Sequence, residues 1–289
     1  MISCSATRIA PTPSGFLHIG NVLSFAITAW LAEQTGASIL LRVDDLDRER
    51  VREEYLEDIF DTLRFLDIPW QNGPRSSADI ALRDSQHRRI PLYTRALDQL
   101  REGGWVYGCT CSRSQLLNNS CSCAEKNISP DEEGIAWRMR TAKDVITGFR
   151  DLAGQYISMA LPDEMRHFVV RKRDGSPAYQ LTSVCDDLYY GIDLVVRGKD
   201  LLASTLAQQF LAECLGATAF RNAYFYHHVL IEEDGMKLSK SEGAVSVQYM
   251  RKNGWKKEDV YRAVANRLHI TETVSNWHSL ASVVFKQPL

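Results

Sequence analysis

The chain has 289 residues, of which 45% are hydrophobic and 24% charged, and its formal net charge is −2. These values are typical of a globular protein with one large or two small domains, and they exclude a generally basic nucleic-acid-binding protein. No apolar run approaches the roughly 20 residues that cross a bilayer, and the N-terminus lacks the pattern of a signal peptide. We therefore expect a cytoplasmic protein with reduced cysteines and no membrane partner.

Residues 8–21, with the sequence RIAPTPSGFLHIGN, predict a short strand, a turn rich in proline and glycine, and the start of a helix. Apolar residues follow at helical spacing from Val22. The turn therefore lies at a helix N-terminus, where free backbone N–H groups attract phosphate. His18 and Asn21 would add side-chain donors there, and Gly20 would let a flat ligand approach the backbone.

The next segment, residues 38–43, is a nearly continuous apolar run, as expected of a buried parallel strand. Three aspartates follow it in Asp44-Asp45-Leu46-Asp47, at the ligand-binding edge of an open α/β sheet. The alternatives are a helix N-cap or a metal-binding pair of aspartates. Helices are predicted at 49–66 and 86–103, and the alternation of strands and helices predicts a doubly wound parallel sheet.

Two close pairs of cysteines follow the second helix, and a mainly extended, irregular segment at 124–165 follows them. The pairs can place four thiolates around one tetrahedral Zn²⁺, the alternative being four unligated thiols on a loop. The four candidate metal ligands are Cys109, Cys111, Cys121 and Cys123.

The chain then returns to strand and helix patterns typical of the same sheet. The predicted elements are strands at 167–172, 192–197 and 223–231, helices starting at 179 and 201, and a helical tail from 247. We expect four parts: a first Rossmann half at 1–104, a zinc-bearing insert at 105–166, a second Rossmann half at 167–245, and the tail at 246–289.

A glycine-flanked loop at residues 235–243, GMKLSKSEG, contains Lys237 and Lys240. It is either a solvated charged loop or a clamp for nucleotide phosphates. Together with His18-Ile19-Gly20-Asn21, it resembles the HIGH and KMSKS signatures of class I aminoacyl-tRNA synthetases. The stretch at Arg8 resembles the glutamate branch of that class, and most of all the glutamyl-queuosine tRNA(Asp) synthetase family of short paralogues, which lack an anticodon-binding domain.

This resemblance implies a class I Rossmann-type α/β fold with a zinc-bearing insert and a short helical tail. It also implies a glutamate pocket in which Arg8 receives the side-chain carboxylate and Asp44 holds the ammonium group. The other implied pocket residues are Ala10, Thr12, Tyr179 and Arg197. The alternative for Arg8 and Arg197 is structural ion pairing with Asp44 or Asp193.

The implied reaction has two steps, and the chain is expected to act as a monomer. Glutamate attacks ATP, whose phosphates carry Mg²⁺, and the glutamyl group then passes to the queuosine base at the wobble position of tRNA(Asp). The implied catalytic residues are His18, Asn21, Lys237 and Lys240, and the implied ATP-binding residues are His18, Gly20, Asn21 and Lys240.

The sequence departs from that family's pattern at two places. Asp44 stands where the family has Glu, and Cys121 and Cys123 stand in place of a tyrosine and a more distant cysteine. Three alternatives stay open: a truncated glutamyl-tRNA synthetase that charges tRNA(Glu), a non-catalytic tRNA-binding paralogue, and a nucleotidyltransferase of the same fold.

Overall fold

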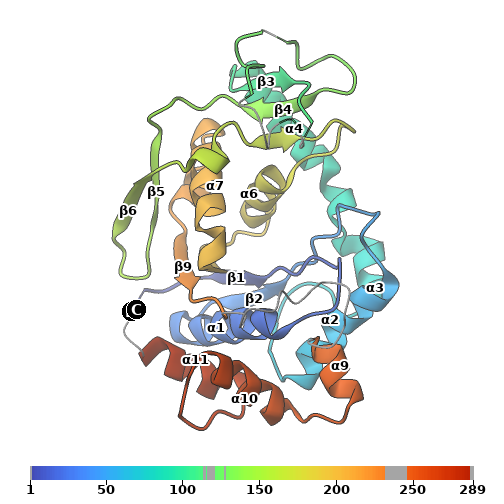
Figure 1. Cartoon of the computed structure of the whole chain (residues 1–289), viewed down its shortest axis with the longest axis vertical. Coiled ribbons are helices and arrows are strands. Elements are labelled where there is room, and N and C mark those ends of the chain that lie inside the picture. The colour runs from blue at the N-terminus through green and yellow to red at the C-terminus, as the bar shows by residue number, and fades with distance from the viewer. Residues whose placement is uncertain (1, 113–114, 116–120, 127, 232–245, 287–289) are drawn as a thin grey trace. The chain divides into compact units, whose positions relative to one another are not determined.

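A computed structural model describes residues 2–112, 115, 121–126, 128–231 and 246–286. The chain divides into two compact units, and Figure 1 shows their helices and strands along the chain. The first unit contains residues 1–88, 194–200 and 225–289, and the second contains residues 89–193 and 201–224.

The first unit is built on parallel strands in the order β2-β1-β8-β9. Strand β1 (Ala6–Ile9) pairs in parallel with both β2 (Ser38–Leu41) and β8 (Leu194–Gly198), and β9 is Tyr224–His228. All five residues of β8 and three of the four in β1 and in β2 are buried. The parallel pairing of β1 with β2 and with β8 confirms the predicted parallel sheet, and such buried strands are expected where both faces of a sheet are covered.

Helices of the first unit pack on helix α1 (Ile19–Thr35), which connects β1 to β2 and ends at Gly36 with φ of 78°. The predicted helical tail is confirmed as α9 (Val247–Lys252), α10 (Lys257–Arg267) and α11 (Trp277–Lys286). Both α10 and α11 contact α1 (Figure 1). The ring centroids of Trp30 in α1 and Phe285 in α11 lie 4.4 Å apart. The tail therefore completes the apolar core around α1.

The second unit combines α-helices with a three-stranded antiparallel sheet and a β-hairpin. Helix α6 (Tyr179–Tyr189) packs on α4 (Ile90–Glu102) and on α7 (Leu202–Cys214), and the short α8 (Thr218–Arg221) packs on α6 and α7. One sheet has the order β3-β4-β7, and strands β5 and β6 form a hairpin. The strands are β3 (Val106–Cys109), β4 (Ala136–Met139), β5 (Ile146–Arg150), β6 (Tyr156–Ala160) and β7 (Val169–Arg171).

The segment between β2 and α4 differs most from the prediction. Helix α2 (Glu53–Phe65) begins four residues later than predicted, and its N-cap is Arg52. The aspartates after β2 therefore lie in a loop, and the N-cap interpretation of them is wrong. Residues 77–84 form two short turns that were not predicted, α3 (Ser77–Asp79) and a π-helical turn at Ile80–Asp84, and the helix predicted at 86–103 begins with a 3-10 turn at Gln86–Arg89. These turns are too short for an apolar period to reveal them.

In the part of the chain that the structure describes, none of the helices has the length and apolar character of a membrane span.

A buried ion pair joins α6 to the residue that precedes α4 in the second unit. Arg89 contacts both carboxylate oxygens of Asp186, with Nε–Oδ1 and Nη2–Oδ2 distances of 2.7 and 3.1 Å. The Tyr93 hydroxyl donates to Oδ1 of Asp186 at 2.7 Å, and Arg89 also donates to the Tyr190 hydroxyl. Burial, together with the charge of Asp186, raises the pKa of Tyr93 well above its ordinary value, so this hydroxyl stays a donor.

We expect Asp186→Ala to lower the free energy of unfolding by about 3–5 kcal/mol, because it leaves the buried Arg89 guanidinium without its carboxylate. Tyr93→Phe removes a single hydrogen bond to the same carboxylate and should cost about 1–2 kcal/mol. Urea denaturation followed by circular dichroism measures both effects. Asp163→Asn is the control, because Asp163 is fully open to solvent at 3.6 Å from Arg166, and it should leave the midpoint unchanged.

Candidate functional site

The turn at residues 10–18 ends in a capping box at the start of α1. The backbone N–H of Gly20 donates to Nδ1 of His18 at 3.1 Å, and the N–H of His18 donates to Oδ1 of Asn21 at 3.0 Å. Since Nδ1 accepts a hydrogen bond, the neutral imidazole carries its proton on Nε2. His18 is exposed and lies at the positive end of the helix dipole, where a phosphate group is attracted.

The structure shows a second reason why residue 20 is a glycine, which the sequence alone did not reveal. A Cβ atom at this position would lie 2.9 Å from Cε1 and 3.0 Å from Nδ1 of His18. Both distances are shorter than ordinary carbon contacts, so a side chain at Gly20 would displace the imidazole. Glycine is therefore needed for the ring to fold back onto the helix end.

Two buried arginines lie on neighbouring strands of the first unit. Arg8 in β1 and Arg197 in β8 are 5% and 4% exposed, and Arg8 Nη1 donates to the carbonyl of Val196 at 3.3 Å. The positive charge of Arg197 also acts on His227 in β9. Burial, assisted by that charge, lowers the pKa of His227 to about 4, so His227 is neutral near pH 7. The sequence analysis had not identified His227 as part of this region.

Asp44 lies in the loop after β2, where Arg42 holds it. The Nε–Oδ1 and Nη2–Oδ2 distances are 2.7 and 3.1 Å, a two-point contact between groups that are 2% and 12% exposed. The backbone N–H of Asp44 donates to the carbonyl of Pro11 at 3.0 Å, which ties this loop to the turn after β1. The structure therefore makes Arg42 the residue that orients Asp44. Sequence reasoning missed it because an arginine within an apolar run gives no signal of its partner.

The remaining predicted site residues are distributed as follows. Ala10 is half-buried directly after β1, and Thr12 is exposed between two prolines, with its carbonyl accepting from the N–H of Ser14 at 2.8 Å. Tyr179 is the first residue of α6 in the second unit and is 45% exposed. Lys237 and Lys240 lie outside the described residues.

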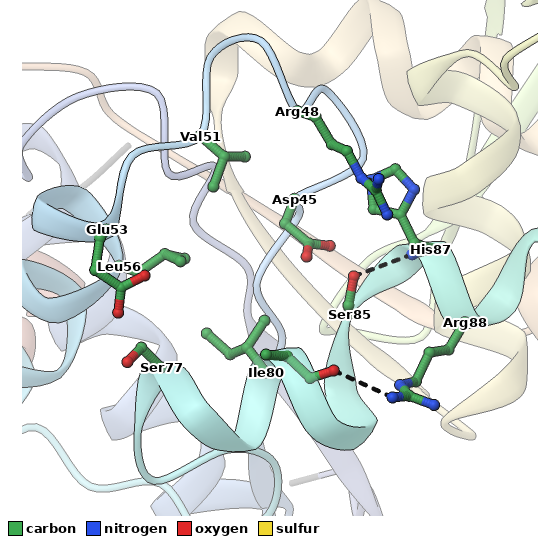
Figure 2. A pocket seen from close by; sticks show the side chains of 11 residues that line it. Asp45, Arg48, Val51, Glu53, Leu56, Ser77, Ile80, Ser85, His87 and Arg88 are labelled. Atoms are coloured by element: carbon green, nitrogen blue, oxygen red, sulfur yellow. Dashed lines mark hydrogen bonds between the residues drawn. The ribbon is translucent and has the colours of Figure 1, made fainter.

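A pocket of about 430 Å³ opens in the first unit beside the loop that follows β2 (Figure 2). Asp45 points into it, and the backbone N–H of Gln86 donates to Oδ1 of Asp45 at 2.7 Å. On one wall, Nε of Arg48 lies 3.1 Å from Nε2 of His87. The lining residues are Asp45, Arg48, Val51, Glu53, Leu56, Ser77, Ile80, Ala81, Ser85, His87 and Arg88.

The volume of this pocket is in the range that holds small organic molecules. The pocket is lined by carboxylates, by cationic side chains and by apolar residues such as Leu56 and Ile80. Asp45 lines it and Asp44 does not. Sequence analysis had not singled out the pocket, because most of its wall comes from the short turns at residues 77–89.

The four predicted cysteine ligands come together in the second unit. Their sulfur atoms all lie within 4.8 Å of one another, and the Cys109–Cys121, Cys111–Cys121 and Cys111–Cys123 distances are 3.6, 3.8 and 3.5 Å. Cys109 and Cys123 are buried. Four sulfurs at these separations can surround a single metal ion.

The acid–base properties of these thiols differ because their surroundings differ. Burial raises the pKa of Cys109, and burial and the neighbouring thiols raise that of Cys111 to about 12. Burial opposes a charge on Cys123 as well, but the N–H of Thr110 and the thiols of Cys111 and Cys121 donate to its sulfur and bring its pKa down to about 6. One thiolate is thus favoured even in the metal-free cluster.

A buried hydroxyl provides a second observation at the cysteine cluster. Tyr107 is fully buried and packs with Cys109 and Cys123, and its hydroxyl interacts with the Cys121 thiol. Thiolates held by a metal would accept from such a hydroxyl more strongly than neutral thiols do. The residues present therefore fit a bound metal ion.

Comparisons with a family model and with individual proteins identify the same family. Residues 5–134 and 121–277 match the family described as tRNA synthetases class I (E and Q), catalytic domain. The chain is 36% identical over 241 residues to the Glutamyl-Q tRNA(Asp) synthetase of Methylococcus capsulatus, covering 82% of this chain and 76% of that protein. It is 31% identical over 274 residues to Glutamate--tRNA ligase 2 of Syntrophus aciditrophicus, covering 86% of this chain and 54% of that protein.

The fold also resembles solved structures. A glutamate tRNA ligase from Elizabethkingia meningosepticum, crystallised with its amino acid, aligns with a TM-score of 0.70 at 21% identity, covering 96% of this chain and 64% of that one. The class I synthetase fold expected from the sequence is therefore confirmed.

We expect protein purified without chelator to contain about one divalent metal ion per chain, because the four thiols form one cluster. Cys111→Ser should lower the metal content and make the β3-β4-β7 sheet more sensitive to proteolysis, while the parallel sheet of the first unit stays protected. Elemental analysis and limited proteolysis measure these effects. Cys214→Ser changes a half-buried thiol outside the cluster and should alter neither result.

Proposed function

We propose that this chain, which belongs to the class I tRNA synthetases for glutamate and glutamine, activates L-glutamate with ATP and transfers the glutamyl group to the queuosine base of tRNA(Asp). The observation that carries the first half of this proposal is the pair of buried arginines, Arg8 and Arg197, on neighbouring strands. Two buried guanidinium groups suit a substrate that brings a carboxylate. The second half rests on the similarity to proteins named for this acceptor.

In the first step, the α-carboxylate of glutamate attacks the α-phosphorus of ATP, and pyrophosphate leaves. This reaction needs position and charge more than proton transfer. His18 would donate from Nε2 to the phosphates, a role favoured by the acceptor bond at its Nδ1. Mg²⁺ bound to ATP would neutralise charge on the phosphates, and Lys240, assisted by Lys237, would stabilise the leaving pyrophosphate.

The amino-acid end of the substrate would lie along the loop after β2 and the turn after β1. Arg8 would receive the side-chain carboxylate, and Arg197 would add positive charge nearby. Asp44, held in place by Arg42, would accept from the α-ammonium group. Ala10 and Thr12 would complete the part of the pocket that lies in the first unit, and the role of Tyr179 stays a prediction from the motif that it resembles.

We also propose that the metal in the second unit is zinc. Four thiolates with no carboxylate or imidazole among them form the ligand set that zinc prefers in structural sites. With all four positions taken by sulfur, the metal would have no open site for a substrate. Its role would be to hold β3 and the cysteine loop together.

One alternative function has direct support. The chain is 30–32% identical to several glutamate--tRNA ligases, of whose length it spans 54–60%. Transfer of glutamate to tRNA(Glu) is therefore the function against which the proposal must be tested.

The acceptor is tested with radiolabelled glutamate and three tRNAs. We expect transfer to tRNA(Asp) that carries queuosine, and none above background to tRNA(Asp) with unmodified guanosine or to tRNA(Glu). The ester to a base hydroxyl should also survive nuclease removal of the 3′ end. Labelling of tRNA(Glu) at its 3′ end would instead establish the alternative, and no labelling of any tRNA despite adenylate formation would leave the acceptor assignment wrong.

The amino acid is tested by ATP–pyrophosphate exchange without tRNA. We expect glutamate to exceed glutamine by about 10⁴-fold in kcat/KM, because an amide cannot replace the carboxylate beside a buried guanidinium. Arg8→Ala should lower exchange with glutamate by roughly 10²–10³-fold and remove most of this preference. Arg8→Lys keeps the charge without the planar fork, so its exchange rate with glutamate should lie between those of the unaltered protein and Arg8→Ala. Comparable rates for both amino acids with the unaltered protein would contradict the pocket assignment.

A further inference from the structure

A buried carboxylate in the first unit connects three segments that are far apart in the sequence. Asp58 of α2 is 2% exposed, and its Oδ2 accepts from the backbone N–H of Leu17 at 3.3 Å. Its Oδ1 accepts from Nη2 of Arg251 at 2.6 Å and from the Thr62 hydroxyl at 3.3 Å. Burial raises the pKa of Asp58, while the bonds from Leu17 and Arg251 favour its charged form. Arg251 is thus the cation that compensates this buried acid.

The same segments are joined a second time through the backbone. The N–H of Val247 donates to the carbonyl of Leu17 at 2.8 Å, and His18 pairs with Ser246 in an antiparallel bridge. Ser246 caps α9 by accepting from the N–H of Tyr249 at 3.1 Å. Leu17 therefore has its N–H held by α2 and its carbonyl held by the start of α9.

This arrangement fixes the residue next to His18 from two sides. Arg251 lies one helical turn beyond the start of α9, so the ion pair to Asp58 determines where that start lies relative to α2. In the sequence, Ser246 directly follows residues 232–245, which contain Lys237 and Lys240. His18 and the lysine-containing stretch, which are proposed to act on the phosphates, are thus next in sequence to Leu17 and Ser246, which belong to the segments that Asp58 and Arg251 connect.

We propose that Asp58 and Arg251 are a positioning pair for the adenylation step: they hold the turn that carries His18 against the chain segment that follows the lysine-containing stretch. This inference rests on the proposed function and deepens it. Neither residue is assigned a contact with substrate. Their effect acts through the position of Leu17 and Val247.

The chain provides a matched control in the second contact of Arg251. Its Nη1 lies 3.5 Å from Oδ2 of Asp61, which is 53% exposed, whereas the Asp58 side chain is 1% exposed. An exposed ion pair contributes little, because water and salt screen it. Asp61→Asn therefore removes one carboxylate partner of Arg251 without touching the buried pair.

The experiment compares Arg251→Gln, Asp58→Asn, the double variant and Asp61→Asn in the full chain by glutamate-dependent ATP–pyrophosphate exchange. We expect each single change at the pair to lower kcat by about 10²-fold, because a displacement of about 1 Å of reacting groups has this effect. The KM for glutamate should change less than about 2-fold. The double variant should be no worse than either single variant, since all three lose the same interaction. Asp61→Asn should stay within about 2-fold of the unaltered protein.

A kcat within about 2-fold for Arg251→Gln would overturn the proposal, and so would a double variant in which the two losses multiply. Should a single variant fail to fold, the kcat of the double variant tests the proposal instead, because the double variant leaves no buried charge without a partner. A kcat restored to the level of the unaltered protein in the double variant would then count against positioning by this pair.

Amide hydrogen exchange supplies a readout that does not need activity. In Arg251→Gln the amides of Leu17 and Val247 should exchange faster together, while amides of α6 in the second unit keep their rates. Unchanged protection of both amides would overturn the proposal. If the unaltered protein shows no glutamate-dependent exchange, the proposed function fails by itself, and the hydrogen-exchange result still decides whether the pair holds the turn.

Discussion

A guanidinium group buried away from water costs several kcal/mol unless acceptors or an anion lie beside it. Among the described residues of the first unit, three arginines are buried in or directly after the strands: Arg8, Arg42 and Arg197. Asp44 compensates Arg42, and the carbonyl of Val196 accepts from Arg8. Burial, assisted by the charge of Arg197, favours the neutral form of His227. These buried cations are the basis of the glutamate site proposed above.

The same cost explains why buried acids join distant elements in both units. Asp58 accepts from three donors that belong to the turn before α1, to α2 itself and to α9. Asp186 accepts from Arg89 and Tyr93, and so joins α6 to the start of α4. A buried carboxylate that loses one donor becomes costly, so each of these acids favours a single arrangement of its elements. Apolar packing alone tolerates small shifts more readily.

Elements with a strong local pattern were predicted well, and elements without one were not. Strand β2 and the first three residues of β8 are largely apolar and buried, as is typical of strands that are covered on both faces. The start of α2 was predicted four residues too early, because the charged stretch at residues 49–52 has good helix formers but no apolar side to pack. The turns at residues 77–89 show no period at all. The backbone N–H of Gln86 donates to Asp45 and so connects this segment to the loop after β2, a contact that no local pattern shows.

By itself, the sequence determined the parts of this protein whose geometry is local. Asn21 follows His18 by three residues, so its side chain can accept from the backbone N–H of His18 at the start of the helix. Each pair of cysteines, Cys109 with Cys111 and Cys121 with Cys123, is separated by one residue, so its two sulfurs can lie close together. Only the tertiary structure decided that Arg8 bonds to Val196, 188 residues away, and that Asp58 bonds to Arg251, 193 residues away. Such contacts depend on strand order and on the packing of α9 against α2, and both follow from burial summed over the whole chain rather than from any local pattern.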